Sequence, residues 1–319
     1  MSQPTRRSVL KTGILFACCG ISHVRPARAQ SGTVEALPVK EVVDGVFSFA
    51  GRPEMMSEKN EGEICNVSFI IGDEAVAVID SGGSVAEARE LLAAIRANTD
   101  KPIRYLINTH MHPDHIFGNA AFEGTGAIIT GHHNLPRALA SRGDYYLQSY
   151  REAMGSALMA DIRIVPPTKL ITSEEQLDLG NRKLTLKAWK PAHTDNDLTI
   201  FDEQSGTFFT GDLCFIDHLP TMDGSLRGWI AQLEDLKAIR AKFAVPGHGP
   251  VPSPWPQALE QEQRYFDALA RDIRKAIADG VPMVEAVKTA AESERNNWHL
   301  FDEYNLRNAT AAFAELEWE

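Results

Sequence analysis

The stretch INTHMHPDHIFGNAAF (Ile107–Phe122) places three histidines and one aspartate within six residues, directly behind a short apolar run. Packing alone rarely calls for such a group, because every buried ring or carboxylate needs a partner and an unpaired buried charge is costly. A divalent cation would satisfy all four side chains together, since zinc accepts both imidazole nitrogen and carboxylate oxygen. The candidate metal ligands of this stretch are His110, His112, Asp114 and His115.

The chain direction around Pro113 bears on how many ions these side chains could hold. A loop that leaves a strand can aim alternate side chains, here His110 and His112, at one ion. Asp114 and His115 follow Pro113 with a different local direction, so they could address a second ion. A single ion needs about four ligands, and this turn alone supplies four candidates, so both arrangements stay open at this point.

Three further candidates each follow a strand-like run, beside glycine or proline or in a polar loop. They are His193 in KPAHTDND, Asp212 in FFTGDLCF and His248 in VPGHGP. Each alone is typical of an ordinary turn, because glycine and aspartate favour turns for backbone reasons. Their order along the chain, behind the histidine-rich stretch, supports the metal interpretation.

The whole set resembles the signature of the metallo-β-lactamase superfamily, which is His-x-His-x-Asp-His followed by a separate histidine, an aspartate and a final histidine. The resemblance runs from about Val42 to Pro250, and Asp80 in NVSFIIGDEAVAVIDSGG matches a carboxylate that supports the metal loop. It implies an α/β fold, a four-layer αβ/βα sandwich with two metals in a cleft at one edge. It also implies the ligands, which are His110, His112 and His193 for site one, Asp114, His115 and His248 for site two, and Asp212 between them.

The chemistry that the resemblance implies is hydrolysis by a hydroxide that bridges two zinc ions. Zinc lowers the pKa of bound water from about 15.7 towards 7, so no serine or cysteine nucleophile is required. We expect two Zn²⁺ per chain, with iron or manganese as alternatives, and attack on an ester, thioester or lactone carbonyl. We also expect a catalytic role for Asp114 beside its role as a ligand, and a substrate contact for His218, six residues after Asp212.

The branch of the superfamily is less tightly specified. The commonest zinc β-lactamases have a cysteine ligand where this chain has Asp212, so a dedicated β-lactamase is not favoured. The sequence looks more like the thioesterase and lactonase branches, including type II glyoxalases, although no glutathione-binding pattern follows His248. The stretch TGDLCFIDHLPTMDGSLRGWIAQLEDL looks most like the zinc metallohydrolases associated with quinoprotein dehydrogenase relay systems. The alternatives are a β-lactam hydrolase, a mononuclear iron persulfide dioxygenase and a metal-stabilised binding protein.

The amino terminus predicts export. Residues 1–29 carry five basic and no acidic side chains, TRRSVLK resembles the twin-arginine pattern, and Ala27-Arg28-Ala29 offers a cleavage site. An ordinary secretion signal that happens to contain two arginines is the alternative. We expect a periplasmic protein without a stable membrane anchor, because the apolar stretch falls short of the roughly 20 residues that span a bilayer.

The charge of the chain limits its partners. Removal of residues 1–29 would change the formal net charge from −11 to −16, which argues against nucleic acid as a partner. We expect a small-molecule substrate and, from the resemblance, a periplasmic quinoprotein dehydrogenase system as a partner.

Residues 30–319 are expected to form a single domain with a helical carboxyl-terminal segment from about 254 to 319. Strands and helices follow each other in two successive rounds, which predicts stacked sheets with helices outside. The helical stretch 132–161 carries tyrosines and methionines that we assign to core or lid packing, without chemistry. Cys65 and Cys214 are expected as unpaired core residues, although an oxidising compartment would permit a disulfide.

Overall fold

A seven-stranded sheet has its strands side by side in chain order from β1 to β7. Its first four strands pair antiparallel, whereas β4 to β7 pair parallel. The computed structural model describes residues 34–319, so the predicted export signal lies outside the described residues. The strands are β1 (Lys40–Val43), β2 (Val46–Phe49), β3 (Val67–Ile71), β4 (Val76–Ile79), β5 (Ile103–Ile107), β6 (Ile128–His132) and β7 (Lys169–Ile171).

A second, six-stranded sheet has the order β13-β12-β11-β10-β9-β8. Its neighbours pair antiparallel except β11 and β12, which are parallel, so the carboxyl ends of these two strands lie at the same edge. The strands are β8 (Glu174–Asp178), β9 (Lys183–Ala188), β10 (Leu198–Asp202), β11 (Thr207–Phe215), β12 (Phe243–His248) and β13 (Ser253–Pro254).

The two sheets pack face to face because their strands alternate in which side chains they present to each face. In β4, Ala77 and Ile79 belong to a buried cluster that also contains Leu186 and Ile200 of the second sheet. The intervening Val76 and Val78 belong instead to the cluster on the outer face of the first sheet. This period of two is the strand geometry itself, and it gives each sheet two buried faces.

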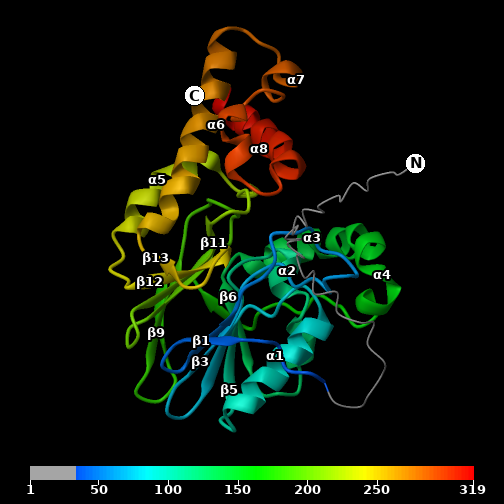
Figure 1. The fold of residues 1–319 in the computed structure, drawn as a ribbon, viewed down its shortest axis with the longest axis vertical. Helices are drawn as coiled ribbons and strands as arrows, with labels where there is room; N and C mark the ends of the chain where they lie inside the picture. Colours follow the sequence, from blue (N-terminus) through cyan, green and yellow to red (C-terminus); the bar gives the residue numbers. More distant parts are fainter. Residues whose placement is uncertain (1–33) are drawn as a thin grey trace, which may run out of the picture. The chain divides into compact units, whose positions relative to one another are not determined.

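Helices cover both outer faces (Figure 1). Helix α1 (Val85–Asn98) packs Leu91 and Ile95 against the first sheet, and its first turn is capped by Ser84, whose Oγ accepts from Glu87 N at 3.1 Å. Helices α5 and α6 pack in the same way against the second sheet. The order helix, sheet, sheet, helix is the predicted four-layer αβ/βα sandwich. The further helices are α2 (Pro113–Ile116), α3 (Leu135–Ser149), α4 (Arg151–Met159), α5 (Leu226–Lys237), α6 (Glu260–Ala278), α7 (Met283–Ala286) and α8 (Phe301–Leu316).

The carboxyl-terminal segment is helical, as predicted, and it is bound to the loop that follows β11. Helices α6 and α8 lie side by side (Figure 1). His218 and His299 pair through their backbones, and Asn308 of α8 donates from Nδ2 to Pro220 O at 2.6 Å. Within residues 34–319 no helix combines the length and apolar character that a bilayer-spanning segment requires.

A buried ion pair, Arg182 with Asp202, connects the two sheets at the edge opposite the loop that follows β11. Arg182, directly before β9, donates to both carboxylate oxygens of Asp202 at the end of β10. Its Nη1 also donates to the main-chain oxygens of Asp44 and Ile71 in the first sheet, at 3.2 and 3.0 Å. Both side chains are almost fully buried, so each depends on the other for compensation of its charge.

Candidate metal centre

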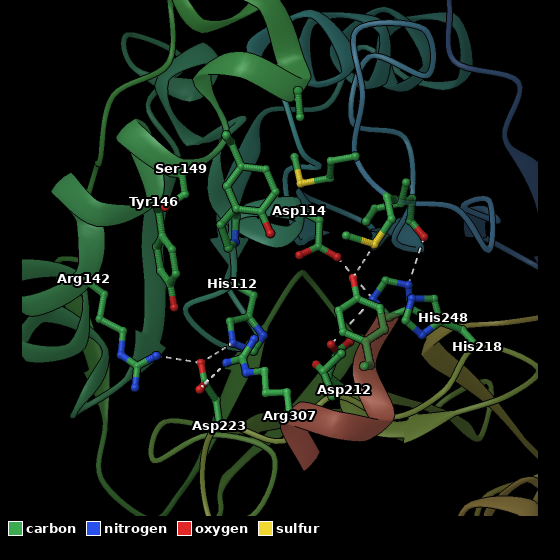
Figure 2. Close-up of a pocket in the computed structure, with 18 of the residues that line it drawn as sticks. His112, Asp114, Arg142, Tyr146, Ser149, Asp212, His218, Asp223, His248 and Arg307 are labelled. Carbon is green, nitrogen blue, oxygen red and sulfur yellow. Dashed lines mark hydrogen bonds and ion pairs between the residues drawn. The ribbon is translucent and has the colours of Figure 1, made fainter. Parts of the chain in front are cut away.

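A cavity of about 650 Å³ opens where loops from both sheets meet (Figure 2). The cavity is lined by four of the seven predicted ligands, which are His112, Asp114, Asp212 and His248. The other three lie beneath its surface, fully or almost fully buried. The site therefore lies at the carboxyl ends of strands, where loops can bring distant side chains together.

The loop after β5 directs its four candidate ligands towards two groups of partners, one of the two arrangements that the sequence left open. The chain bends at His110 and Met111 and is extended again at His112, and His110 and His112 each contribute a nitrogen to the same group. Pro113 then occupies the first position of the short helix α2, where its fixed φ suits helix entry. The helical turn directs Asp114 and His115 towards a different group of partners.

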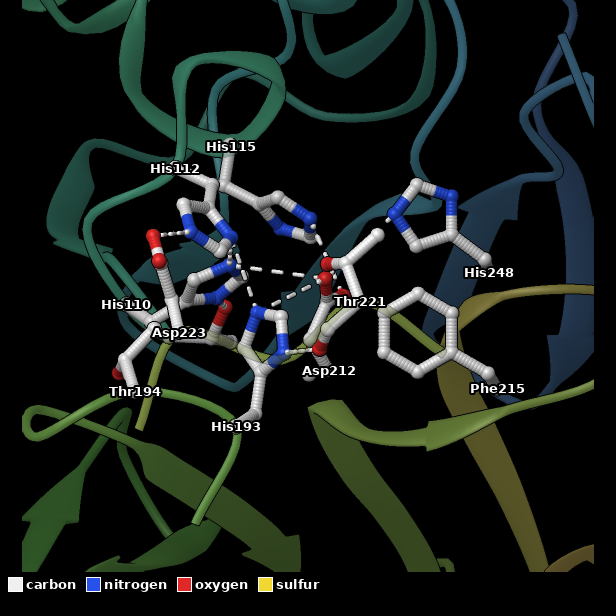
Figure 3. Close-up of polar contacts among 12 residues, drawn as sticks. His110, His112, His115, His193, Thr194, Asp212, Phe215, Thr221, Asp223 and His248 are labelled. Atoms are coloured by element: carbon white, nitrogen blue, oxygen red, sulfur yellow. Dashed lines mark hydrogen bonds and ion pairs between the residues drawn. The ribbon is translucent and has the colours of Figure 1, made fainter. Parts of the chain in front are cut away.

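The first group consists of three imidazole nitrogens and one carboxylate oxygen (Figure 3). His112 Nδ1 lies 3.1 Å from His110 Nε2 and 2.9 Å from His193 Nε2. Asp212 Oδ2 lies 3.3 Å from His193 Nε2 and 3.5 Å from His110 Nε2. Ligand atoms arranged tetrahedrally around zinc at 2.0–2.1 Å would be about 3.3 Å apart, so the spacing suits one ion.

The second group shares Asp212 with the first. His115 Nε2 lies 3.1 Å from Asp212 Oδ1 and 3.4 Å from Asp114 Oδ2. His248 Nε2 lies 3.2 Å from Asp114 Oδ2 and 3.6 Å from Asp212 Oδ2. Asp212 Oδ2 faces His110, His193 and His248, and its Oδ1 faces His115, so this carboxylate lies between the two groups, where a bridging ligand would lie.

Each ring of the cluster directs one nitrogen inward and gives the other a fixed partner. The outer nitrogens of His115, His193 and His248 contact Asp80 Oδ2, Thr221 O and Ile64 O at 2.8, 2.7 and 3.0 Å. Those of His110 and His112 contact Thr109 Oγ1 and Asp223 Oδ2 at 3.0 and 3.1 Å. Such partners set the tautomer and orientation of metal-binding histidines, so the lone pairs point into the cluster.

The cluster also contains polar atoms that a cation would satisfy. His115 Nε2 and Asp212 Oδ1 are buried and make no hydrogen bond within residues 34–319, although they lie close to each other. Buried polar atoms are rarely left without a partner, because each costs roughly 1–3 kcal/mol. The donor set of imidazole and carboxylate therefore fits one or two divalent metal ions.

The carboxylates and imidazoles of the cluster shift each other's pKa values. Burial raises the pKa of Asp212 and Asp114, but the neighbouring histidines overcome this effect and hold both pKa values well below the usual range. Burial lowers the pKa of His248, yet Asp212 and Asp114 raise it to about 9. Burial lowers the pKa of His115 too, but Cys65, Asp212 and the other neighbouring acidic groups raise it well above its usual value. Protons on these rings therefore occupy the place of the metal charge and must leave when metal binds.

Two glycines make room for Asp212. Gly211 has φ +50° at an irregularity in the pairing of β11 with β12, and a Cβ there would meet Thr109 Cβ at 2.6 Å. A Cβ on Gly247 would lie 1.9 Å from Asp212 Oδ1. The bulge and the close approach together aim the carboxylate of Asp212 at the cluster.

The cavity contains residues that sequence analysis did not select. Asp223 contacts His112 and two arginines, Arg142 of α3 and Arg307 of α8. No motif surrounds these three positions, so nothing in the sequence distinguished them from surface charges. Several tyrosines that we assigned to packing also line the cavity: Tyr145, Tyr146 and Tyr150. Met154 and Met159 of the same stretch are buried, as packing residues are.

The remaining sequence expectations can be placed in the structure. His218 lines the cavity, its ring stacks on His248 at 4.7 Å between centroids, and burial lowers its pKa to about 3. His218 Nδ1 faces Leu219 O at 2.8 Å, which leaves Nε2 as an acceptor. Cys65 and Cys214 are buried and free, so no disulfide joins them.

Comparison with known proteins agrees with this geometry. The family model of the metallo-beta-lactamase superfamily matches residues 60–248, a range that includes all seven ligands. The chain belongs to the metallo-beta-lactamase superfamily. Members of this superfamily are metal-dependent hydrolases, which suits a cluster built from histidine and aspartate.

Individual members of the superfamily are similar to this chain at low identity. A linear primary-alkylsulfatase from Pseudomonas sp. is 24% identical over 220 residues, which cover 57% of this chain and 40% of the relative. A beta-lactamase-like protein 2 homolog from Caenorhabditis elegans is 24% identical over 191 residues, covering 58% of this chain and 56% of the relative. The chain therefore spans about half the length of these relatives.

A solved structure supports the fold. A metallo-beta-lactamase family protein from Thermus thermophilus has a TM-score of 0.62 with 21% identity, over 87% of this chain and 94% of that protein. At this identity the likeness concerns the arrangement of the sheets and helices.

Proposed function

We propose that this chain is a periplasmic hydrolase that holds two divalent metal ions, zinc in the first instance, and cleaves an ester, thioester or lactone. The observation that supports this most directly is the division of seven buried or half-buried ligands into two groups that share Asp212. Such ions, when bound, lower the pKa of water towards 7 and polarise the bond that is cleaved.

The residues of the chain would bind, orient and exchange protons around that chemistry. Asp114 lies at the boundary between the cluster and the cavity, and its carboxylate is ionised because the adjacent histidines outweigh the effect of burial on its pKa. As an ionised group it would accept a hydrogen bond from the attacking water and orient it. His218 Nε2 is an acceptor on the cavity wall, where it would contact and orient the substrate.

A sulfate ester is the second candidate substrate class. The alkylsulfatase from Pseudomonas sp. is one of the relatives of this chain, and two arginines face the cavity beside the cluster. A guanidinium matches the geometry of an oxyanion, so the cavity suits a sulfate as well as a carbonyl ester.

Elemental analysis of the mature protein tests the metal part of the proposal, and a panel of substrates tests the chemistry. The panel comprises a thioester, a lactone, an aryl ester, an alkyl sulfate and a β-lactam. We expect two zinc ions per chain and turnover of at least one acyl ester, thioester or lactone. One iron per chain with oxygen uptake on a persulfide would contradict the proposal and favour a dioxygenase.

Replacement of a ligand separates a catalytic centre from a structural one. His112→Ala removes a ring that lies at the cavity surface, so we expect activity to fall by at least a hundredfold while circular dichroism stays native. His133→Ala is the matched control, because that ring stacks on His132 away from the cluster. Unchanged turnover in His112→Ala would show that the metals only hold loops.

Export and partnership belong to the same proposal. The basic amino terminus supports twin-arginine export, and the stretch after Asp212 supports association with a quinoprotein dehydrogenase system. Fractionation of cells that express the full chain, with and without Arg6→Lys and Arg7→Lys together, tests the export route. Appearance of the double variant in the periplasm at the normal level would exclude that route.

A further inference from the structure

Residues from one face of α3 and one face of α8 line the cavity. Arg142, Tyr146 and Ser149 follow each other at intervals of four and three residues along α3, so they project from one side of the helix. Tyr304 and Arg307 are three residues apart on α8 and also line the cavity. The two arginines therefore arrive from elements far apart in the sequence (Figure 2).

A single carboxylate holds both arginines. Arg142 Nη1 donates to Asp223 Oδ2 at 2.8 Å, and Arg307 Nη2 donates to Asp223 Oδ1 at 2.5 Å. The same carboxylate contacts His112 Nε2 at 3.1 Å. Asp223 thus connects both arginines to His112 of the metal cluster, and it fixes their position relative to that cluster.

The charges of this group do not cancel. Two guanidinium ions and one carboxylate leave one positive charge, in a chain whose formal net charge is −11. A guanidinium has five N–H donors, and Asp223 occupies one nitrogen of each arginine. The side chains of Arg142 and Arg307 remain 41% and 52% exposed, so donors stay available to a molecule in the cavity.

The surroundings of the arginines suit a substrate with an apolar body. Tyr150 and Met56 line the same cavity, and Met55 and Tyr145 at its margin are exposed by 45% and 65%. Tyr146 is buried, and apart from Arg142 its hydroxyl has no hydrogen-bond partner within the described residues. Aromatic and thioether side chains provide apolar contact for such a body.

We propose that Arg142 and Arg307 form an anion subsite that selects substrates carrying a negatively charged oxyanion group on an apolar body. This proposal deepens the hydrolase function proposed above and rests on it. Arg307 lies in α8, outside the residues 60–248 that match the family model, so the carboxyl-terminal helices contribute half of the subsite. Asn308, the next residue, holds this part of α8 on the loop that carries Asp223.

Equilibrium binding tests the subsite without any need for turnover. The probes are 4-phenylbutyrate and its neutral amide, titrated calorimetrically into the zinc-loaded protein and its Arg142→Gln and Arg307→Gln variants. We expect the native protein to prefer the carboxylate, and each variant to lose about tenfold of that preference, the effect of one charge-assisted hydrogen bond. Arg137→Gln is the matched control, because Arg137 lies on α3 but pairs with Asp195 outside the cavity. A preference that both variants retain would overturn the proposal, since the metals alone would then hold the anion.

A kinetic comparison distinguishes the subsite from a purely structural clamp. The substrates are a carboxylate-bearing aryl ester, its neutral methyl analogue and an alkyl sulfate. For Arg307→Gln we expect the ratio of kcat/KM for the charged over the neutral ester to fall about tenfold, mainly through KM. An equal fall for both esters, together with lost zinc, would overturn the proposal, because the arginines would then only position Asp223 and His112.

The alkyl sulfate identifies which anion the subsite receives. A loss of kcat restricted to the alkyl sulfate would support the proposal with the reacting sulfate itself as the bound group. A loss restricted to the carboxylate ester would support it with a group remote from the cleaved bond. If the native protein hydrolyses neither these three substrates nor the thioester and lactone of the first panel, the proposed function fails, whereas the calorimetric preference still decides the subsite.

Discussion

Asparagine has almost the same shape as aspartate, but replacing Asp80 with asparagine exchanges a hydrogen-bond acceptor for a donor next to the metal cluster. Asp80 is buried, and its Oδ1 accepts from Thr109 N at 2.8 Å. Its Oδ2 accepts from Thr109 Oγ1 and His115 Nδ1 at 2.7 and 2.8 Å. A main-chain N–H cannot change its role, so the amide oxygen of asparagine must remain on Thr109 N and the NH₂ group must face His115.

This arrangement forces the wrong tautomer on His115. Its Nδ1 can accept from the new NH₂ group only when the ring hydrogen moves to Nε2, the atom that faces Asp212 and Asp114. A hydrogen on Nε2 occupies the lone pair that a metal requires. Thr109 Oγ1 can accept from both the amide and His110, so His110 keeps its tautomer.

The expected magnitude follows from what such partners usually contribute. Loss of the partner of a metal-binding histidine lowers metal affinity by about 10- to 100-fold, or roughly 1.4–2.8 kcal/mol. We expect Asp80→Asn to retain one tightly bound zinc ion per chain. The second ion, at the group that contains His115, should bind about 10- to 100-fold more weakly. Elemental analysis after dialysis and calorimetric zinc titration measure both quantities.

Two further variants make the tautomer argument specific. Asp80→Ala removes all three acceptor contacts but leaves the tautomer of His115 free, so we expect it to lower thermal stability more than Asp80→Asn and zinc affinity less. Asp73→Asn, an exposed aspartate in the turn between β3 and β4, is the control. Two zinc ions with native affinity in Asp80→Asn, or weaker zinc binding in Asp80→Ala than in Asp80→Asn, would refute the reasoning.

Three other predictions follow from the same contacts. Gly247→Ala would place a Cβ 1.9 Å from Asp212 Oδ1, so we expect less than two zinc ions per chain with native circular dichroism; full zinc content would contradict this. Arg182→Met leaves the buried Asp202 unpaired and should lower the free energy of unfolding by about 3–5 kcal/mol in a denaturant titration, and a loss below about 1 kcal/mol would disprove it. Because the pKa of His248 is raised to about 9 in the metal-free protein, zinc must displace at least that proton at lower pH, so zinc affinity should fall at least tenfold per pH unit as pH decreases. Calorimetry at pH 7 in buffers of different ionisation enthalpy should detect at least one proton released per chain as zinc binds. Zinc binding without proton release would contradict the role of His248 as a ligand.

The sequence by itself determined the layered fold and the identities of the seven candidate ligands. Strand and helix periodicity are local properties, so alternation in β9 and helical spacing in α1 could be recognised without coordinates. The spacing around Pro113 is also local, and it raised the possibility that Asp114 and His115 address other partners than His110 and His112, as they do in the structure. These features depend on residues within a few positions of one another.

Only the tertiary structure decided which atoms face the cluster and what surrounds it. The inward nitrogen is Nδ1 in His112 and Nε2 in His110, and this difference depends on Asp223 and Thr109, which come from different loops. The meeting of Arg142, Arg307 and Asp223 likewise joins three elements separated by more than eighty positions in the chain. A charged residue on a helix has the same local pattern whether it faces solvent or a cavity, because the packing of one element on another, which no short segment encodes, decides between them.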